Sequence, residues 1–513
     1  MGFDNHWVHL VMQCVRTVSY SIIVNGSPVG NFHPSRGIRQ GDPISPYLFL
    51  LCAEVLSHQL HQAEDSGLLK GVPTSFKGMQ INHLFFADDS LLFCKATEHE
   101  WSILSEILWR YEQASGQRLN NDKTSIFFSR NTTIETRSHI VNIVGVPTAQ
   151  RFDTYLGLPT LVGRSRIREF QGLIDRVRRK VFDRKTKFLS LAGKEVLLKA
   201  IVQAIPTYSM SIFLLPKELC KETNKMMQKF WWGHKENENK VHWMSWERLG
   251  RAKSQGGMGF RDLICFNKAL LVKQCWRLLK DPDSLAAKII RAKYYPWGDL
   301  LSATVGSRPS YAWRSIISGR DLLKEGLIWR IGNGQSVAIW GDKWIPQPST
   351  YVIQTHCRNL SPDAKVEELI DANPVRWKKD LIQGMYNQPD RLIWRASPTG
   401  MFTVRSAYHL EDERFDAAKV EQIMKRLSWE ELESFVMTAN RIWKRRNEVI
   451  HGGSFSHPTS VVNEANELLQ SFHRANVSVQ HEDIPIQQTM KWQNPPSEVY
   501  KVNWDVAILV PSN

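Results

Sequence analysis

The sequence predicts an α+β fold, in which antiparallel strands and packed helices are followed by a mostly helical basic region and a Trp-rich C-terminal region. Three observations support this order. Short apolar runs flank the tight-turn dipeptide Asn25-Gly26 and the acidic bend Ala87-Asp88-Asp89, a pattern typical of hairpins. Residues 161–260 hold 21 Lys and Arg against 9 Asp and Glu, and tryptophan recurs from residue 231 to 410.

The first hairpin and the helix after it are indicated by local signals. Residues 18–24 read as a strand that reverses at Asn25-Gly26. Ser45-Pro46 then opens a helix, because serine can cap free amides and proline fits the first helical turn. The apolar stripe of this helix comprises Tyr47, Leu50, Leu51, Val55 and Leu56.

The second hairpin is predicted from residues 81–86 and 90–94, with the two acids at the bend. Adjacent carboxylates repel each other, and hard divalent cations such as Mg²⁺ are the usual reason to place them together. The alternative is an ordinary Asp-containing turn between strands. A helix over residues 98–114 follows, with Trp101, Leu104, Leu108 and Tyr111 at helical spacing and Gly116 as its stop.

Upstream of the acids lies the block Arg36-Gly37-Ile38-Arg39-Gln40-Gly41-Asp42-Pro43. Its glycines would let backbone approach a nucleotide, while Arg39 and Gln40 offer donors for phosphate and for base or sugar edges. The alternative is a polar loop that merely precedes a helix.

Five ordered segments resemble reverse transcriptases of plant LINE-type non-LTR retrotransposons. They are Asn25 to Gly30, Arg36 to Pro46, Phe86 to Asp89, Ser115 to Thr124, and Tyr155-Leu156-Gly157-Leu158-Pro159. The resemblance implies a polymerase palm and a thumb, an RNA template, a DNA primer, deoxynucleoside triphosphates, and nucleotidyl transfer by two metal ions, Mg²⁺ or Mn²⁺. It implies that Asp88 and Asp89 are the catalytic metal-binding pair. The nucleotide-binding residues that it implies are Arg39, Gln40, Gly41 and Lys123.

The resemblance also implies parts that this sequence lacks. The family's third palm carboxylate lies upstream of a segment matching Gly2-Phe3 and Trp7, and its endonuclease domain lies further upstream. Asp4 falls downstream of the expected acid and is no substitute for it. Enzyme activity is therefore an open question, and the alternatives are a catalytically inactive nucleic-acid-binding remnant or a decayed reading frame whose product does not fold.

The basic stretch directly follows the palm motifs, where a thumb would hold template and primer. Phosphate contacts of this kind give salt-sensitive, sequence-independent binding, and the alternative is a solvated helical face. The candidate nucleic-acid-binding residues are Arg164, Arg166, Arg176, Arg178, Arg179, Lys180, Arg184, Lys185 and Lys187.

Five regions follow from these features. They are a partial fingers and palm (1–130), a thumb-like basic region (131–260), a Trp-rich connector leading into a remnant of the reverse-transcriptase zinc-binding domain (261–410), a charged linker (411–490) and a truncated start of an RNase-H-like domain (491–513). No zinc is expected, because no cysteine follows Cys357. Asp505 would match the first acid of the RNase-H-like domain, but too few residues follow for that fold.

Composition narrows the class of protein further. The 513 residues carry a net charge of +15 and 7 scattered cysteines without a Cys-x-x-Cys pair, which argues against a disulfide framework. The longest apolar stretch, residues 47–56, is interrupted by Glu54, so no membrane contact is expected. We expect a nuclear or cytoplasmic protein that is not secreted.

Overall fold

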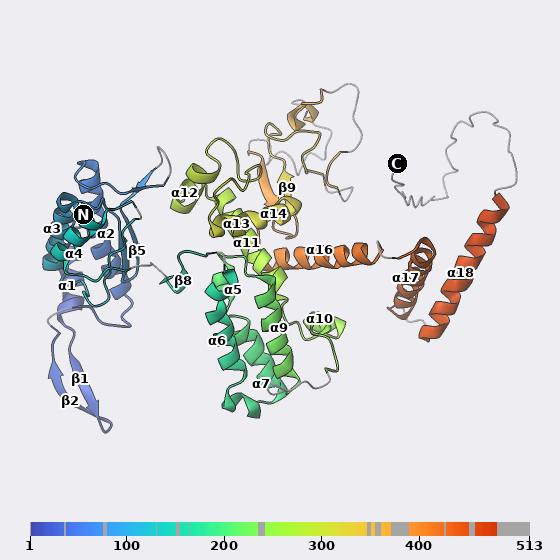
Figure 1. The fold of residues 1–513 in the computed structure, drawn as a ribbon, viewed down its shortest axis with the longest axis horizontal. Coiled ribbons are helices and arrows are strands. Elements are labelled where there is room, and N and C mark those ends of the chain that lie inside the picture. The colour runs from blue at the N-terminus through green and yellow to red at the C-terminus, as the bar shows by residue number, and fades with distance from the viewer. Residues whose placement is uncertain are drawn as a thin grey trace. The chain divides into compact units, whose positions relative to one another are not determined.

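The computed structural model describes residues 2–34, 37–74, 79–129, 131–149, 154–163, 165–233, 242–345, 350–353, 361–370, 389–424, 427–450 and 457–479. The chain divides into two compact units, Met1–Arg414 and Phe415–Asn513. The first unit contains helices and small two-stranded antiparallel sheets (Figure 1), in agreement with the predicted α+β class. None of the helices in the described part of the chain is long and apolar enough to span a membrane.

The N-terminal part consists of two-stranded hairpins and four helices. Its elements are α1 (Asn5–Arg16), β1 (Tyr20–Val24), β2 (Ser27–Phe32), α2 (Ser45–Asp65), β3 (Val72–Pro73), β4 (Gln80–Ile81), β5 (His83–Phe86), β6 (Asp89–Leu92), α3 (Glu98–Ser115) and α4 (Ile134–Val144). The predicted hairpins are confirmed, since β1 pairs with β2 and β5 pairs with β6, both antiparallel. Asn25 and Gly26 both adopt left-handed φ angles at the first turn.

The predicted helix α3 is confirmed almost residue for residue. The Thr97 side chain caps its N-terminus, and Gly116 ends it with a left-handed φ of 73°. Its inner face joins that of α2 in a small core made of Leu56, Leu60, Ala63, Leu69, Leu104, Leu108 and Tyr111. This core supports the hairpin that carries the two acids, because Phe85 and Leu92 pack against it.

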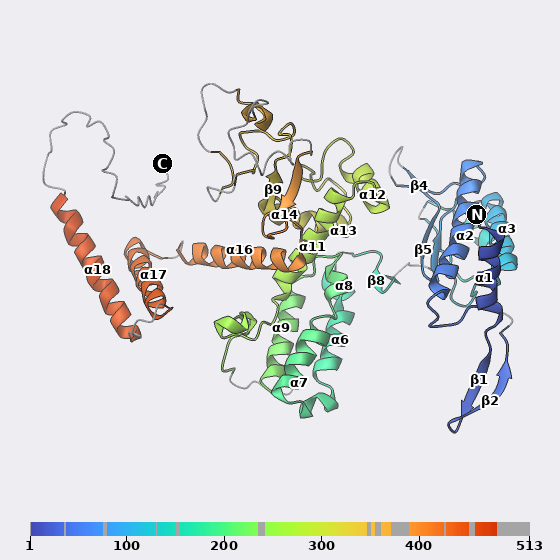
Figure 2. The same cartoon turned by 180° about the vertical axis from the view of Figure 1, so that it is seen from behind.

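The apolar stripe predicted for α2 is only partly buried. Tyr47 and Leu50 are exposed, and the buried positions lie instead in the C-terminal half of the helix, at Leu56, Leu60 and Ala63. The reason is that α2 packs on α3 and β5 through this later half. The β1–β2 hairpin also exposes apolar side chains, and it projects from the neighbouring helices in both views (Figures 1 and 2).

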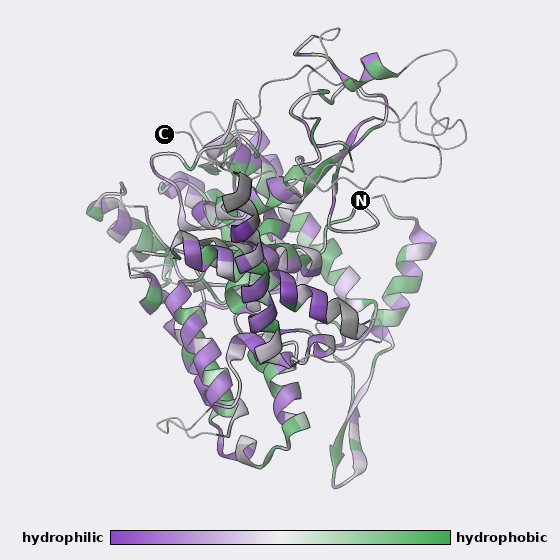
Figure 3. Cartoon of the chain, turned by 90° about the vertical axis from the view of Figure 1, so that its right-hand side faces the viewer, coloured by the Kyte–Doolittle hydropathy of each residue, from purple (hydrophilic) through white to green (hydrophobic). Residues whose placement is uncertain are grey.

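The basic region is helical, as predicted. It opens with the hairpin β7 (Thr154–Tyr155) and β8 (Leu158–Pro159), and its helices are α5 (Arg166–Glu169), α6 (Gln171–Val181), η1 (Arg184–Phe188), α7 (Leu191–Val196), η2 (Leu197–Val202), α8 (Thr207–Met210), α9 (Lys217–Trp231), α10 (Trp246–Gly250) and η3 (Lys253–Gln255). Each longer helix carries both hydrophobic and hydrophilic residues (Figure 3), and the apolar faces of α6 and α9 share one core.

The next elements follow α11 (Leu263–Lys280), which contributes buried residues to a second core. They are α12 (Leu285–Tyr294), α13 (Tyr311–Ser318), α14 (Arg320–Gly326), β9 (Leu327–Arg330), η4 (Val366–Leu369) and β10 (Arg391–Trp394). Most described tryptophans here serve as core: Trp313 and Trp394 are fully buried, and Trp276 lies edge-on to Trp394. By contrast, Trp243 and Trp297 are exposed.

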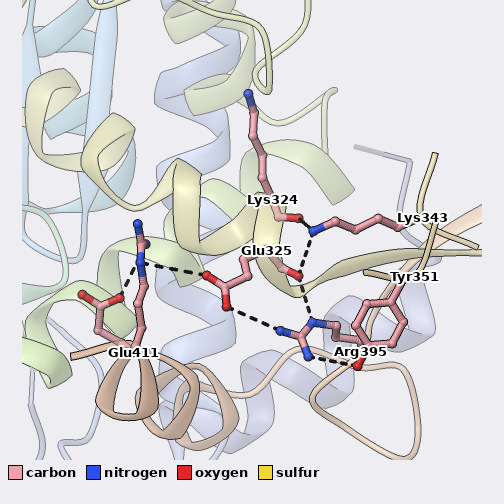
Figure 4. Close-up of polar contacts among 7 residues, drawn as sticks. Lys324, Glu325, Lys343, Tyr351, Arg395 and Glu411 are labelled. Carbon is pink, nitrogen blue, oxygen red and sulfur yellow. Dashed lines mark hydrogen bonds and ion pairs between the residues drawn. The ribbon is translucent and has the colours of Figure 1, made fainter. Parts of the chain in front are cut away.

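Strands β9 and β10 pair antiparallel although they are far apart in sequence. Figure 4 shows a polar cluster beside them, in which the Arg395 guanidinium donates to the Glu325 carbonyl and to the Tyr351 hydroxyl. Lys343 donates to the carbonyls of Lys324 and Glu325. The Arg395 bond fastens the end of α14 to the chain that follows β10, and the Lys343 bonds fasten it to the chain that follows β9.

Helix α16 (Val404–Met424) leads out of the first unit, and the second unit contains α17 (Trp429–Ile450) and α18 (Pro458–Val479). The two helices of this unit pack on each other, and an ion pair between Arg441 and Glu464 joins them at 3.4 Å. Residues 491–513, including Asp505, lie outside the described residues, as does Cys357. The six described cysteines are unpaired.

Candidate active site

The two adjacent acids lie at an exposed hairpin tip. Phe86 pairs with Asp89, so Ala87 and Asp88 form the turn and Asp89 begins β6. Ala87 adopts a left-handed φ of 49°, which is uncommon for a residue with a side chain. Both carboxylates are exposed, and neither forms an ion pair with a cation in the described part of the chain. The tip therefore presents two uncompensated carboxylates to solvent.

The base of this hairpin is anchored to α2. The His83 ring is hydrogen-bonded to the Ser57 hydroxyl at 2.9 Å, and the buried Asn82 amide donates to the Glu64 carboxylate at 2.6 Å. Burial lowers the pKa of His83, the nearby His61 lowers it further, and Glu54 opposes both effects. A fixed base and an exposed tip hold the acids in one place without covering them.

The glycine-containing loop before α2 is closed by its own hydrogen bonds. Gly37 and Gly41 have left-handed φ angles of 78° and 84°. The Ser45 hydroxyl donates to the Arg39 carbonyl at 2.7 Å and so joins the loop to α2. The prediction that Ser45 caps this helix is wrong, because the N-cap residue is Ile44, which makes no side-chain cap bond. Arg39 and Gln40 remain exposed.

Lys123 lies on a separate turn after α3. The Asn120 side chain accepts the backbone N–H groups of Asp122 and Lys123, which fixes this turn, and the lysine side chain is exposed. In the described residues no hydrogen bond or ion pair joins Lys123 or Arg39 to either acid. The candidate nucleotide-binding residues are thus exposed on loops, and they do not contact the acids in this structure.

The Tyr155–Pro159 segment forms a tight hairpin, with left-handed φ angles at Leu156 and Gly157. Burial raises the pKa of Tyr155, and the Asp89 carboxylate and Tyr208 raise it further. The sequence did not predict that Tyr155 lies near Asp89. The only signal for this segment was its resemblance motif, Tyr155 to Pro159, which follows the acids in order along the chain.

The basic candidates divide by their surroundings. Arg178 is held by two carboxylates, Asp175 and Glu222, each at 3.2 Å, so it cross-links α6 to α9. The Arg166 guanidinium lies over the Tyr311 ring at 5.1 Å. The candidates that face solvent on this surface are Arg176, Arg179, Lys180, Arg184 and Lys185. Arg164 and the side chain of Lys187 lie outside the described residues.

The donor set at the hairpin tip is limited to its two acids. Throughout the described ranges, no three or more His, Cys, Asp or Glu side chains gather to hold a metal ion. Two carboxylates nevertheless match the way Mg²⁺ often binds, which uses one or two protein carboxylates together with substrate phosphates and water. The tip fits one cation shared with a phosphate, but it does not fit an all-protein metal cage.

Comparison with known proteins defines the class of this site. Residues 1–159, which contain both acids and both loops, match the family model "Reverse transcriptase (RNA-dependent DNA polymerase)". The N-terminal part is therefore a reverse transcriptase domain.

The relatives are plant proteins. The chain is 47% identical over 143 residues to the uncharacterized mitochondrial protein AtMg00310 of Arabidopsis thaliana, covering 28% of this chain and 93% of that one. It is 40% identical over 111 residues to the uncharacterized mitochondrial protein AtMg01250 of the same plant, covering 21% of this chain and 86% of that one. The chain belongs to this plant family of reverse-transcriptase-related proteins.

A longer relative matches more of the chain. The Arabidopsis thaliana protein named "Putative ribonuclease H protein At1g65750" is 29% identical over 273 residues, which cover 49% of this chain and 44% of the relative. The chain thus spans less than half of the length of this relative.

Proposed function

We propose that this chain is an RNA-directed DNA polymerase of a LINE-type non-LTR retrotransposon, acting in the nucleus or cytoplasm. It would add deoxynucleotides to the 3′-hydroxyl of a DNA primer on an RNA template. The observation that carries the proposal is the exposed pair of acids on an anchored hairpin, within a domain that matches reverse transcriptases. Aspartate favours turns, but in the described residues no ion pair accounts for two adjacent exposed carboxylates, and metal-dependent phosphoryl transfer needs them.

In this proposal Asp88 and Asp89 hold Mg²⁺ or Mn²⁺ together with the phosphates of the incoming nucleotide. The cation would neutralise charge that develops on the transferring phosphoryl group. Arg39 and Gln40 would donate to the nucleotide, and Gly41 would let the backbone approach it. Lys123 would add a positive charge near the nucleotide, and the exposed cations of the helical region would hold template and primer through their phosphates.

A second candidate function is nucleic-acid binding without catalysis. It is favoured by the limited donor set, since two-metal transfer needs a further ligand that bridges both ions, and the described residues gather only two acids at the tip. The basic helical surface would still bind nucleic acid in this case.

Primer extension on an RNA template, with Mg²⁺ or Mn²⁺, tests the proposal. We expect extension by the full chain, and a loss of at least about a hundredfold in both Asp88→Asn and Asp89→Asn, because each change removes a metal ligand. Asp283→Asn is the matched control, since Asp283 is a highly exposed acid far from the hairpin in the sequence. Extension that survives the double Asn variant would refute the assigned roles. No extension by the unaltered chain, with template binding retained, would favour the second candidate.

A further inference from the structure

The turn between α6 and α7 holds two apolar side chains in solvent. Phe188 is 91% exposed, and Leu191, three residues later, is 66% exposed. The turn lies at the end of α6 remote from α5 (Figures 1 and 2). Neighbouring exposed apolar side chains on a folded surface are a common mark of an interaction site.

Hydrogen bonds fix this turn, so the exposure of Phe188 is built into the fold. The Asp183 carboxylate accepts the N–H of Lys185 at 3.1 Å, and the Thr186 hydroxyl donates to the Val181 carbonyl at 3.0 Å. On the far side, the Ser190 hydroxyl accepts the N–H of Gly193 at 3.2 Å and caps α7. With both flanking helices capped, the ring is held outward on a defined backbone.

Two exposed cations precede the ring in the same turn. The turn is the 3₁₀-helix η1, in which side chains three residues apart lie one above the other, so Lys185 and Phe188 share a side. Arg184 and Lys185 are both exposed, and within the described chain neither forms an ion pair. Along α6, which precedes the turn, Arg176 and Lys180 are four residues apart and exposed on one face.

We infer that residues 184–191 bind a single-stranded segment of nucleic acid, with the Phe188 ring stacked on a base and Arg184 and Lys185 on the flanking phosphates. An exposed aromatic ring beside a row of cations matches how proteins hold single strands without reading sequence. A linear row along a helix also suits a phosphate chain better than the flat surface of an anionic membrane. This inference rests on the proposed function and adds to it a strand contact distinct from the acids.

The test measures binding of a labelled 12-nucleotide single-stranded RNA by fluorescence anisotropy at several salt concentrations, with the full chain. Phe188→Ala should weaken binding by about fivefold to a hundredfold, the range expected for one lost stacking contact. It should leave the salt dependence unchanged, because no charge is removed. Lys185→Ala should instead lower the slope of log K against log salt by about 0.7.

Three further variants distinguish base stacking at residue 188 from a contact that needs only apolar bulk or any exposed ring. Trp297→Ala removes a 98% exposed aromatic side chain from a loop outside the basic surface and should leave binding unchanged. Phe188→Trp should retain binding, and Phe188→Leu, which keeps apolar bulk without a ring, should lose it.

Two outcomes would overturn the inference. In the first, the unaltered chain binds RNA in a salt-sensitive way and Phe188→Ala binds it as tightly as the Trp297→Ala control. The Phe188 contact is then refuted, and binding by the basic surface is retained. If Phe188→Ala leaves RNA binding intact but abolishes binding to phosphatidylserine vesicles, the turn is a membrane contact. Primer extension is scored separately, so loss of this contact and failure of catalysis are distinguishable.

Discussion

Asn267 is a buried polar residue that joins α11 to the segment between α8 and α9. It lies on α11, is 1% exposed, and its amide donates to the carbonyls of Met210 and Phe213. Its side-chain oxygen accepts the N–H of Leu215 at 2.8 Å. The side chain therefore satisfies three backbone groups of the turn between α8 and α9, all of them away from water.

Removing this side chain should be costly. We expect Asn267→Ala to lower the free energy of unfolding by about 2–4 kcal/mol, because three buried backbone groups lose their partners at once. Urea unfolding followed by circular dichroism measures the change. Asn121→Ala, at an exposed position, is the control and should stay within about 0.5 kcal/mol of the unaltered chain. Equal effects of the two changes would contradict the role of Asn267.

The lowered pKa of His83 predicts how the stability of the fold depends on pH. Its pKa in the folded chain is lowered from the ordinary 6.5, mainly by burial, so the unfolded chain binds the proton more readily. The resulting stability is complete above pH 6.5 and is lost as the pH falls through the folded pKa. Thermal unfolding from pH 7.5 to 5 should show a decline that is shallower in His83→Gln. A parallel decline in both proteins would rule out His83 as the cause.

At the scale of elements, one carboxylate joins the start of β10 to the loop that follows β9. The Asp390 side chain, just before β10, accepts the N–H groups of Gly332, Gly334 and Ser336 at 2.7, 2.9 and 2.8 Å. Gly334 has a left-handed φ of 77°, and an added Cβ would lie 2.5 Å from the backbone nitrogen of Glu367. The loop after β9 is therefore shaped to surround this acid.

Replacing the acid should loosen this loop alone. In Asp390→Asn the charge is lost and the amide group opposes a backbone N–H donor, so we expect a loss of about 1–2 kcal/mol. Hydrogen exchange should quicken at the amides of Gly332, Gly334 and Ser336, while those of α11 stay protected. Asp363→Asn, an exposed acid nearby in sequence, should leave these rates unchanged. Protection that persists in Asp390→Asn would show that the carboxylate is dispensable.

Elements marked by local chemistry could be predicted from the sequence. The turn at Asn25-Gly26, the stop at Gly116 and the acids between two apolar runs each specify a conformation within a few residues. The pairing of β9 with β10 and the exposure of Tyr47 could not be predicted, because both depend on partners distant in sequence. At the site, the exposed acids and the glycine loop were predictable, whereas the neighbourhood of Tyr155 and the outward ring of Phe188 required the fold.

For the whole molecule, the buried apolar side chains are distributed unevenly along the chain. The largest described cores lie in the helical regions after residue 154, whereas the reverse transcriptase domain has one small core between α2 and α3. Burial drives stability roughly in proportion to the apolar area removed from water. The domain that carries the acids is thus supported by less burial than the regions that follow it.

The β9–β10 pairing also bears on how the chain acquires its structure during synthesis. Arg330 and Arg391 pair, although about sixty residues separate them in the sequence. At ribosomal rates of roughly 5–20 residues per second, the first strand leaves the ribosome some seconds before its partner exists. For that interval its hydrogen-bonding edge is open to any other extended segment, so this pair of strands forms only after a delay in synthesis.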